Sequence, residues 1–193
     1  MDYVEGTNKY LFCSCIMNLF YLDDNAEKCA QYHCDKHVVK MILETAQLLS
    51  TAHRVLDGEQ YVKLSKNNRR LKYWRLPDDR EEKLYQVFGV NHPVSAWIRF
   101  SSENYKFAYS LFKELIKEYW FRYDKSHKSE ELIIPLSNLP NNIPDDIFIK
   151  PALAMPEQYY NSDPVKAYRD YYKFDKKEIL SYTKRNKPNW LGG

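Results

Sequence analysis

Residues 33–56, HCDKHVVKMILETAQLLSTAHRVL, decide the fold of this chain. At 100° per residue, the polar side chains of this stretch fall on one narrow stripe of a helical wheel. The stripe consists of His33, His37, Lys40, Glu44, Gln47 and Thr51. Apolar side chains cover the opposite side, namely Val39, Ile42, Leu43, Ala46 and Leu49. The pattern predicts a core helix that is buried around most of its circumference and polar along one line.

The sequence around this stretch supplies its start and stop signals. Residues 10–22 are mostly apolar at both odd and even positions, which is typical of an extended segment that is buried on both faces. Residues 23–25, Asp-Asp-Asn, predict a turn and a helix N-cap, and a helical pattern then runs over residues 26–56. Cys34-Asp35 predicts a break with a second cap, and Asp57-Gly58 predicts the end of the helix.

Three further helices are predicted downstream. Asn91-His92-Pro93 starts one of them, because proline suits the first helical position. Apolar residues at helical spacing predict a long amphipathic helix over residues 102–123. Asp163-Pro164 opens a last helix that we expect to reach about Tyr182.

Two segments are predicted to lack regular structure, an insertion that is first basic and then acidic (57–88) and a Pro- and Asn-rich stretch (124–161). The ends of the chain are an N-terminal extension (1–17) and a basic aromatic tail (183–193). We therefore expect an all-α fold. Residues 1–193 should form a compact single-domain helical bundle with long surface loops and a short N-terminal extended segment.

The composition excludes several classes of protein. The chain has 193 residues, of which 44% are hydrophobic and 28% charged, as in one globular domain and unlike a disordered chain. Five glycines argue against a glycine-rich nucleotide-binding loop. The apolar stretch 11–22 is too short to cross a bilayer, and Asp2 and Glu5 stand where a secretory signal carries positive charge. We expect an intracellular protein that is not secreted and has no membrane partner.

Glu44 is the leading candidate for a catalytic group. Met41, Leu48 and Val55 lie close beside the polar stripe, so we expect Glu44 in a half-dry cleft. There the pKa of a carboxyl rises, which suits it to proton transfer. His37 is the second catalytic candidate, since two histidines at i, i+4 are unusual on a plain solvent face. The alternative is a solvated face with a ladder of charges.

Four more residues are candidates for lining the same cleft. His33 and Lys40 share the stripe with Glu44, and His92 and Arg99 belong to the next predicted helix. His92 is equally consistent with a helix cap. A fifth histidine, His53, lies on the apolar side of its helix and is expected to be a hydrogen-bonded core residue.

Metal chemistry is the competing interpretation of the stripe. His33, His37 and Glu44 have the composition of a two-histidine, one-carboxylate site, as in a metal-dependent hydrolase. The His-Glu-x-x-His signature of zinc hydrolases is absent. Four cysteines are grouped near the N-terminus, at Cys13, Cys15, Cys29 and Cys34, but their spacing does not match a zinc knuckle. We expect reduced, buried thiols and no bound metal or cofactor.

Residues 35–44, DKHVVKMILE, follow the pattern D-x-H-aliphatic-x5-E. This pattern resembles a helix of the phage-type pyrimidine-dimer DNA glycosylases with associated lyase activity, the endonuclease V type. Residues 89–93, GVNHP, are similar to the start of the family's second large helix, and residues 187–190, KPNW, are similar to its Pro-x-Trp tail. The resemblance covers residues 35–193 in order, with the insertion at 57–88.

The resemblance implies an enzyme of DNA repair. Glu44 would be the catalytic carboxylate and His37 its neighbour in the active site. The family breaks the glycosidic bond of a pyrimidine in double-stranded DNA, flips a base out of the duplex, and uses its N-terminal α-amine as nucleophile. It needs no small-molecule cofactor. A viral or phage protein of this kind would work in the cytoplasm or nucleus of a host cell.

Two positions depart from the family pattern. The family has an arginine directly before the glutamate, where this chain has Leu43. About 17 residues precede the matching start at Met17-Asn18. The extension could be clipped or be a start-site artefact, it could fold back to the cleft, or Glu44 could activate water in a glycosylase without lyase activity.

Basic residues with interleaved aromatics support a nucleic-acid partner. In residues 62–75 they are Lys63, Lys66, Arg69, Arg70, Lys72 and Arg75, and the tail adds Lys184, Arg185, Lys187 and Trp190. Solubilising loops are the plain alternative. A third reading of the whole chain is a non-catalytic nucleic-acid-binding protein that keeps the fold without the chemistry.

Overall fold

The computed structural model describes residues 18–192, and the chain is mostly helical over this range. Six α-helices follow one another, α1 (Ala26–Tyr32), α2 (Asp35–Asp57), α3 (Arg80–Lys83), α4 (Pro93–Phe100), α5 (Ser102–Tyr123) and α6 (Pro164–Asp175). A two-stranded antiparallel sheet separates α2 from α3, with strands β1 (Glu59–Leu64) and β2 (Arg70–Arg75). Short 3-10 turns are η1 (Lys128–Leu132), η2 (Glu157–Tyr159), η3 (Lys177–Ile179) and η4 (Asn189–Leu191).

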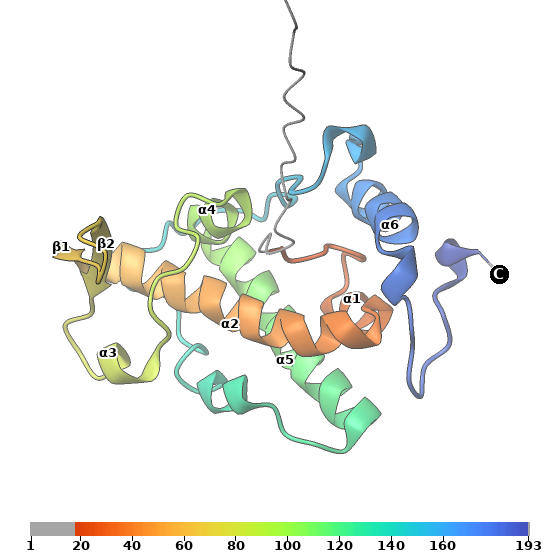
Figure 1. The fold of residues 1–193 in the computed structure, drawn as a ribbon, viewed down its shortest axis with the longest axis horizontal. Coiled ribbons are helices and arrows are strands. Elements are labelled where there is room, and N and C mark those ends of the chain that lie inside the picture. Colours follow the sequence, from red (N-terminus) through yellow and green to blue (C-terminus); the bar gives the residue numbers. More distant parts are fainter. Residues whose placement is uncertain (1–17, 193) are drawn as a thin grey trace, which may run out of the picture.

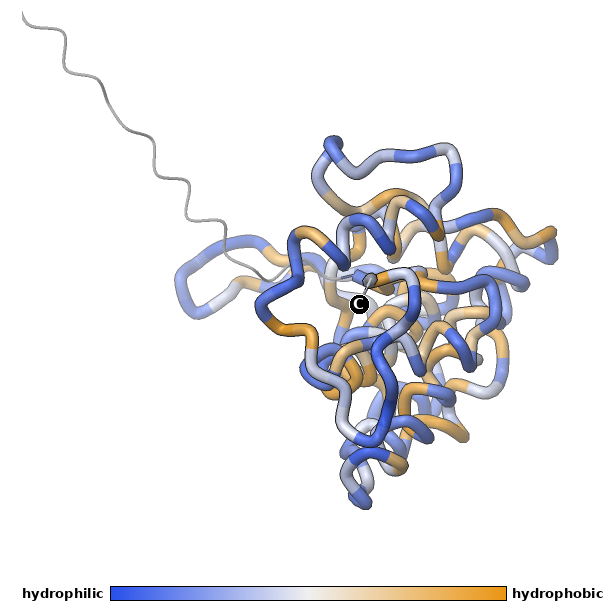
Figure 2. Tube along the Cα trace, turned by 90° about the vertical axis from the view of Figure 1, so that its right-hand side faces the viewer, coloured by the Kyte–Doolittle hydropathy of each residue, from blue (hydrophilic) through white to orange (hydrophobic). Residues whose placement is uncertain are grey.

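Helix α2 crosses the molecule and forms the centre of the fold (Figure 1). It packs against α5 and α4, and α5 also packs against α1. The interior between these helices is apolar, while the outer loops are mostly hydrophilic (Figure 2). None of the helices between residues 18 and 192 combines the length and the apolar character that a membrane span requires.

The predicted signals around α2 are confirmed. The side chain of Asn25 caps α1 by accepting a hydrogen bond from the backbone N–H of Lys28 (3.0 Å). The break falls at residues 33–34, and α2 then runs to Asp57. Gly58 is required there, because a Cβ atom at this position would lie 2.5 Å from the carbonyl oxygen of Arg54. Residues 18–22 are buried and have no regular structure, and the rest of the expected extended segment, residues 10–17, lies outside the described residues.

The starts of the later helices also match their predictions. His92 and Pro93 begin α4, Ser101 caps α5 through Asn104, and Asp163 caps α6 through Val165. The predicted end of the last helix was wrong, since α6 stops at Asp175. The chain then turns back, because the hydroxyl of Tyr182 donates to the carbonyl of Tyr32 at the end of α1 and the N–H of Thr183 donates to Asp35 at the start of α2. A continuous helix to residue 182 would forgo these contacts.

The polar stripe predicted over residues 33–51 is more covered, and the opposite side of α2 more exposed, than the wheel indicates; His33 lies before α2, as the C-cap of α1. His33, His37 and Thr51 are buried, and Thr51 bonds to the backbone of Phe88. Val39 and Leu43, expected on the buried side, are each 40% exposed. The reason is that the neighbours of α2 pack on two flanks and leave a solvent-facing line between them.

The hairpin is the element that the all-α prediction lacked. Residues 59–75 were expected to be irregular, but Tyr61 pairs with Tyr73 across the two strands and their rings stack at 5.7 Å. Asn68 provides the turn with a left-handed backbone (φ 55°). The cross-strand aromatic pair supplies a local reason for sheet that the polar composition concealed.

Candidate functional site

A cleft of 360 Å³ opens beside the N-terminal half of α2. Its other walls come from the segment that begins at residue 18, from the end of α6 and from η3. The lining residues are Asn18, Phe20, His37, Lys40, Tyr171, Asp175, Lys176, Glu178 and Ile179. Two of the residues singled out in the sequence, His37 and Lys40, therefore line the same cleft.

Glu44, which was expected in the cleft, is not among the residues that line it, but it contacts two of them. Its Oε1 lies 3.0 Å from Nζ of Lys40, and its Oε2 accepts a hydrogen bond of 3.2 Å from the backbone N–H of Asn18. Only 12% of the Glu44 side chain is exposed. Burial raises the pKa of this carboxyl, and both contacts oppose that rise. Glu44 is thus a carboxyl that can exchange a proton at a higher pH than an ordinary glutamate.

Asn18 fixes the backbone in front of Glu44 and was missed by the sequence reasoning. Its side-chain oxygen accepts hydrogen bonds from the N–H groups of Leu19 (2.7 Å) and Phe20 (3.2 Å), and its amide donates to the carbonyl of Ala154 (2.7 Å). Phe20 takes a left-handed backbone (φ 44°), which is unusual for a bulky residue. The signal available in the sequence was a lone polar residue at the head of the apolar run 19–22.

His37 stands between two aromatic side chains at the cleft. Its ring stacks on Phe20 with a centroid distance of 4.4 Å, and its Nδ1 lies 2.8 Å from the hydroxyl of Tyr172. Burial lowers the pKa of His37 to about 3, helped by the positive charge of Lys40. His37 is therefore neutral at neutral pH, and it can act as a hydrogen-bond donor or acceptor but carries no charge.

His33 belongs to the core and does not line the cleft. It is fully buried, its Nδ1 donates to the carbonyl of Cys29 (2.7 Å), and burial lowers its pKa to about 4. Between residues 18 and 192, no three His, Cys, Asp or Glu side chains are placed to hold a metal ion. The proposed metal set of His33, His37 and Glu44 is therefore not assembled. Cys29 and Cys34 are free and buried, and Cys13 and Cys15 lie outside the described residues.

The side chains of His92 and Arg99 form hydrogen bonds within and next to helix α4. Nδ1 of His92 accepts a bond from the N–H of Val94 (3.3 Å), which is the capping role. Arg99 donates to the hydroxyl of Ser95 (2.6 Å) and to the carbonyl of Val90 (2.7 Å). Neither residue is among those lining the cleft. His53 is buried and bonds to the hydroxyl of Tyr105 (2.8 Å), as predicted for a core histidine.

The basic tail is largely committed to internal contacts. Lys184 pairs with Asp124 (2.7 Å) and Arg185 with the buried Glu118 (2.8 Å). Trp190 packs edge-on against Tyr32, which ties the tail to α1. Lys187 alone among the tail candidates is exposed without an ion pair in the described part of the chain. The tail therefore stabilises the fold through these contacts and offers few free cations to phosphates.

The basic residues of the hairpin are exposed. Within residues 18–192, no carboxylate lies within ion-pair distance of Lys63, Lys66, Arg69, Arg70, Lys72 or Arg75. The hairpin projects from the C-terminal end of α2, whereas the cleft lies near the N-terminal end (Figure 1). The two candidate regions are thus separated by most of the length of one helix.

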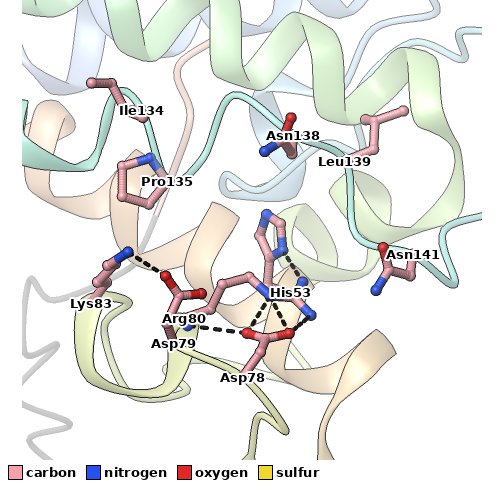
Figure 3. Close-up of a pocket in the computed structure, with 10 residues that line it drawn as sticks. All are labelled: His53, Asp78, Asp79, Arg80, Lys83, Ile134, Pro135, Asn138, Leu139 and Asn141. Carbon is pink, nitrogen blue, oxygen red and sulfur yellow. Dashed lines mark hydrogen bonds and ion pairs between the residues drawn. The ribbon is translucent and has the colours of Figure 1, made fainter.

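A second cavity, of 450 Å³, is lined by residues from segments 78–83 and 134–141 and by His53 of α2 (Figure 3). Arg80 crosses it and bonds to Asp78 (2.7 Å), Asp57 (2.6 Å) and Nδ1 of His53 (2.9 Å). Lys83 pairs with Asp79 at its rim. Because three carboxylates pair with these two cations, the cavity offers no unpaired positive charge to an anionic ligand.

Comparison of the chain with family models, with curated proteins and with solved structures finds no match. Function is therefore inferred from the residues themselves. Among the residues singled out in the sequence, those of the cleft beside Glu44 and of the basic hairpin are accessible to a ligand.

Proposed function

We propose that this protein is a DNA glycosylase that acts on damaged or modified pyrimidines in double-stranded DNA. The observation that carries the proposal is the placement of Glu44, a mostly buried carboxyl of raised pKa in contact with Asn18 and Lys40 at the cleft. The resemblance of residues 35–44 to the pyrimidine-dimer glycosylases points to the same carboxyl. His37, from the same motif, lines the cleft.

Glu44 activates water in the simplest form of the reaction. A lone pair of the water oxygen forms the new bond to C1′ of the sugar, and the carboxylate of Glu44 takes the water proton. The C1′–N1 bond breaks, and the pyrimidine leaves with its electron pair. Neutral His37 donates a hydrogen bond to the departing base, whose negative charge it stabilises. Nδ1 of His37 faces Tyr172, so Nε2 is the atom available for this bond.

The lyase branch replaces water with an amine. The backbone nitrogen of Asn18 is 3.2 Å from Oε2 of Glu44. In a chain that starts at Asn18, this nitrogen becomes an α-amine beside a proton acceptor, which is the arrangement that Schiff-base chemistry at C1′ requires. We propose associated lyase activity for that form of the chain, and water as nucleophile for the longer form.

The proposal includes the setting of the enzyme. The exposed cations of the hairpin would hold double-stranded DNA, and the protein would be an intracellular protein of viral or phage type. Its fold would be one compact helical bundle with long surface loops, to which the hairpin is an addition.

Base release from defined duplexes tests the proposal. We expect the full chain to release pyrimidines from ultraviolet-irradiated duplex or from duplex with a 5-hydroxymethyl pyrimidine, and Glu44→Gln to abolish release. Glu131→Gln is the matched control, because Glu131 is exposed and distant in sequence from the cleft. Borohydride should trap a covalent adduct only with the chain that starts at Asn18. Absence of release from every duplex by both forms would refute the proposal.

A non-catalytic DNA-binding protein is the second candidate, favoured by the exposed hairpin cations and by Leu43 in place of arginine. It predicts that Glu44→Gln leaves duplex binding unchanged and that no base is released by the wild type. The same two assays therefore decide between the candidates.

A further inference from the structure

The β1–β2 hairpin is covered by the rest of the protein only near its base. Most of its strand residues are exposed and none is buried. An isolated two-stranded ribbon is only marginally stable in water, and its exposed apolar side chains Val62, Leu64 and Leu71 add an unfavourable surface. Such an element is better explained by a partner that receives it than by its own contribution to folding.

The register of the hairpin distributes positive charge over both faces and the tip. Residues directly opposite in an antiparallel pair share a face. Lys63 opposite Leu71 lies on one face, and Lys72 opposite Val62 lies on the other. Arg70 shares the face of Lys72, and Arg75 shares that of Lys63. Lys66 and Arg69 occupy the turn.

Positive charge on both faces indicates a partner that is negative on two sides. A duplex groove has a phosphate backbone along each wall, and the major groove, about 12 Å wide, admits a two-stranded β-ribbon. An anionic membrane presents a single plane, and a hairpin that inserts in it needs an apolar tip. The tip here is SKNNR over residues 65–69, and the apolar residues lie behind it. The charge pattern fits the groove.

The base of the hairpin is held rigidly. The buried Arg54 donates to the carbonyl of Trp74 (3.0 Å) and pairs with Glu81 (2.5 Å), which in turn accepts the N–H of Leu76 (2.9 Å). The guanidinium of Arg75 lies 5.3 Å from the ring centroid of Tyr61. These contacts fix the direction in which the hairpin leaves the core, so its base loses little orientational freedom on binding, which favours affinity.

We propose that residues 59–75 form an arm that inserts in the major groove of double-stranded DNA and holds the duplex through its phosphates. The choice of DNA rests on the proposed function. The binding itself does not depend on the chemistry at Glu44.

A matched pair of triple variants in the full chain tests the arm. Lys63→Gln, Lys66→Gln and Lys72→Gln remove one charge from each face and one from the tip. Lys28→Gln, Lys125→Gln and Lys128→Gln remove three exposed charges elsewhere. The dissociation constant for a duplex of about two helical turns is measured against salt. We expect the hairpin variant to reduce the log–log slope by about 2.7, roughly 0.9 per lost phosphate contact, and to bind about 100-fold more weakly at ~0.15 M salt.

Competing ligands test the groove. Methyl green, which occupies the major groove, should displace the wild type, and netropsin, which occupies the minor groove, should not. The proposal is overturned by an unchanged slope in the hairpin variant, by an equal loss in the control variant, or by tighter binding to phosphatidylserine vesicles or single strands than to duplex.

Base release separates this inference from the proposed function. Duplex binding that depends on the hairpin, in a protein that releases no base, keeps the arm and removes the glycosylase. If a hairpin variant releases bases and binds duplex as tightly as the wild type, the glycosylase activity stands and the arm is ruled out.

Discussion

The hydroxyl of Tyr172 lies 2.8 Å from Nδ1 of His37 and accepts the backbone N–H of Cys34 at 2.9 Å. Burial raises the pKa of Tyr172 well above its usual value, so the phenol keeps its single proton. Since that proton cannot go to the Cys34 N–H, it is donated to Nδ1 of His37. His37 therefore carries its own proton on Nε2. Tyr172 makes His37 a fixed hydrogen-bond donor at the cleft.

Tyr172→Phe should remove the preference of His37 for the tautomer with its proton on Nε2. Without the hydroxyl, Nδ1 of His37 has no donor and the N–H of Cys34 has no acceptor, so both tautomers become populated. The unpaired N–H should also cost about 1–3 kcal/mol in the free energy of unfolding. Imidazole ¹⁵N chemical shifts measure the tautomer directly. Tyr160→Phe, at an exposed tyrosine, should leave them unchanged; equal shifts in wild type and Tyr172→Phe would contradict the assignment.

Three buried histidines should make the protein sensitive to acid. Burial lowers the pKa of His33 and His53 to about 4 and that of His37 to about 3. Between pH 6.5 and these folded-state pKa values, the three histidines bind protons only in the unfolded chain. Their contribution to the free energy of unfolding is therefore fully present above pH 6.5 and is lost as pH falls. The loss is about 1.4 kcal/mol per pH unit for each histidine. The raised pKa of Glu44 acts in the opposite sense but is a single group.

Urea unfolding at a series of pH values measures this slope. We expect the free energy of unfolding to decline steeply from pH 6.5 to pH 5. A flat profile over that interval would show that the imidazoles titrate normally in the folded protein.

Arg54→Met should destabilise the fold strongly. The guanidinium is fully buried and bonds to Glu81 and to the carbonyls of Trp74, Glu81, Leu84 and Tyr85. Removing it leaves these acceptors unpaired, at a cost of about 3–5 kcal/mol. Arg69→Met, at an exposed position of the hairpin turn, should change stability by less than about 0.5 kcal/mol. Urea unfolding compares the two, and similar losses would argue against a special role for Arg54.

Lys40→Met should shift the pH dependence of catalysis. Lys40 lowers the pKa of Glu44 through its ion pair, so its removal raises that pKa further. If Glu44 acts as the base, the rising limb of the base-release rate moves to higher pH. Lys36→Met is the control, because Lys36 is exposed one turn earlier and makes no ion pair with Glu44. A limb that stays in place would assign the base to another group.

Local signals in the sequence accounted for most of the helices. Asn25, Gly58, Pro93 and Asp163 act through their immediate neighbours, so their effects on helix ends could be predicted. Long-range contacts could not. The exposure of Val39 and Leu43 depends on which flanks of α2 are covered, and the end of α6 depends on the docking of Tyr182 on Tyr32.

The same distinction applies to the site. Glu44, His37 and Lys40 were found because one helix carries all three. Asn18 and Tyr172 come from segments far away in the sequence, and no spacing rule connects them to α2. The tail cations were assigned to DNA because their carboxylate partners, Asp124 and Glu118, are remote in sequence.

Helix α2 separates the hairpin from the cleft by a fixed length. Gly58 follows Lys40 by 18 positions, a rise of about 27 Å, which equals about eight base pairs of duplex. If the hairpin and the cleft engage one DNA molecule, the length of α2 sets the distance along the duplex between the hairpin contact and the reacting base. A substrate base nearer than this to a duplex terminus, on the side of the hairpin, would then be processed poorly however well its own pocket accepts it.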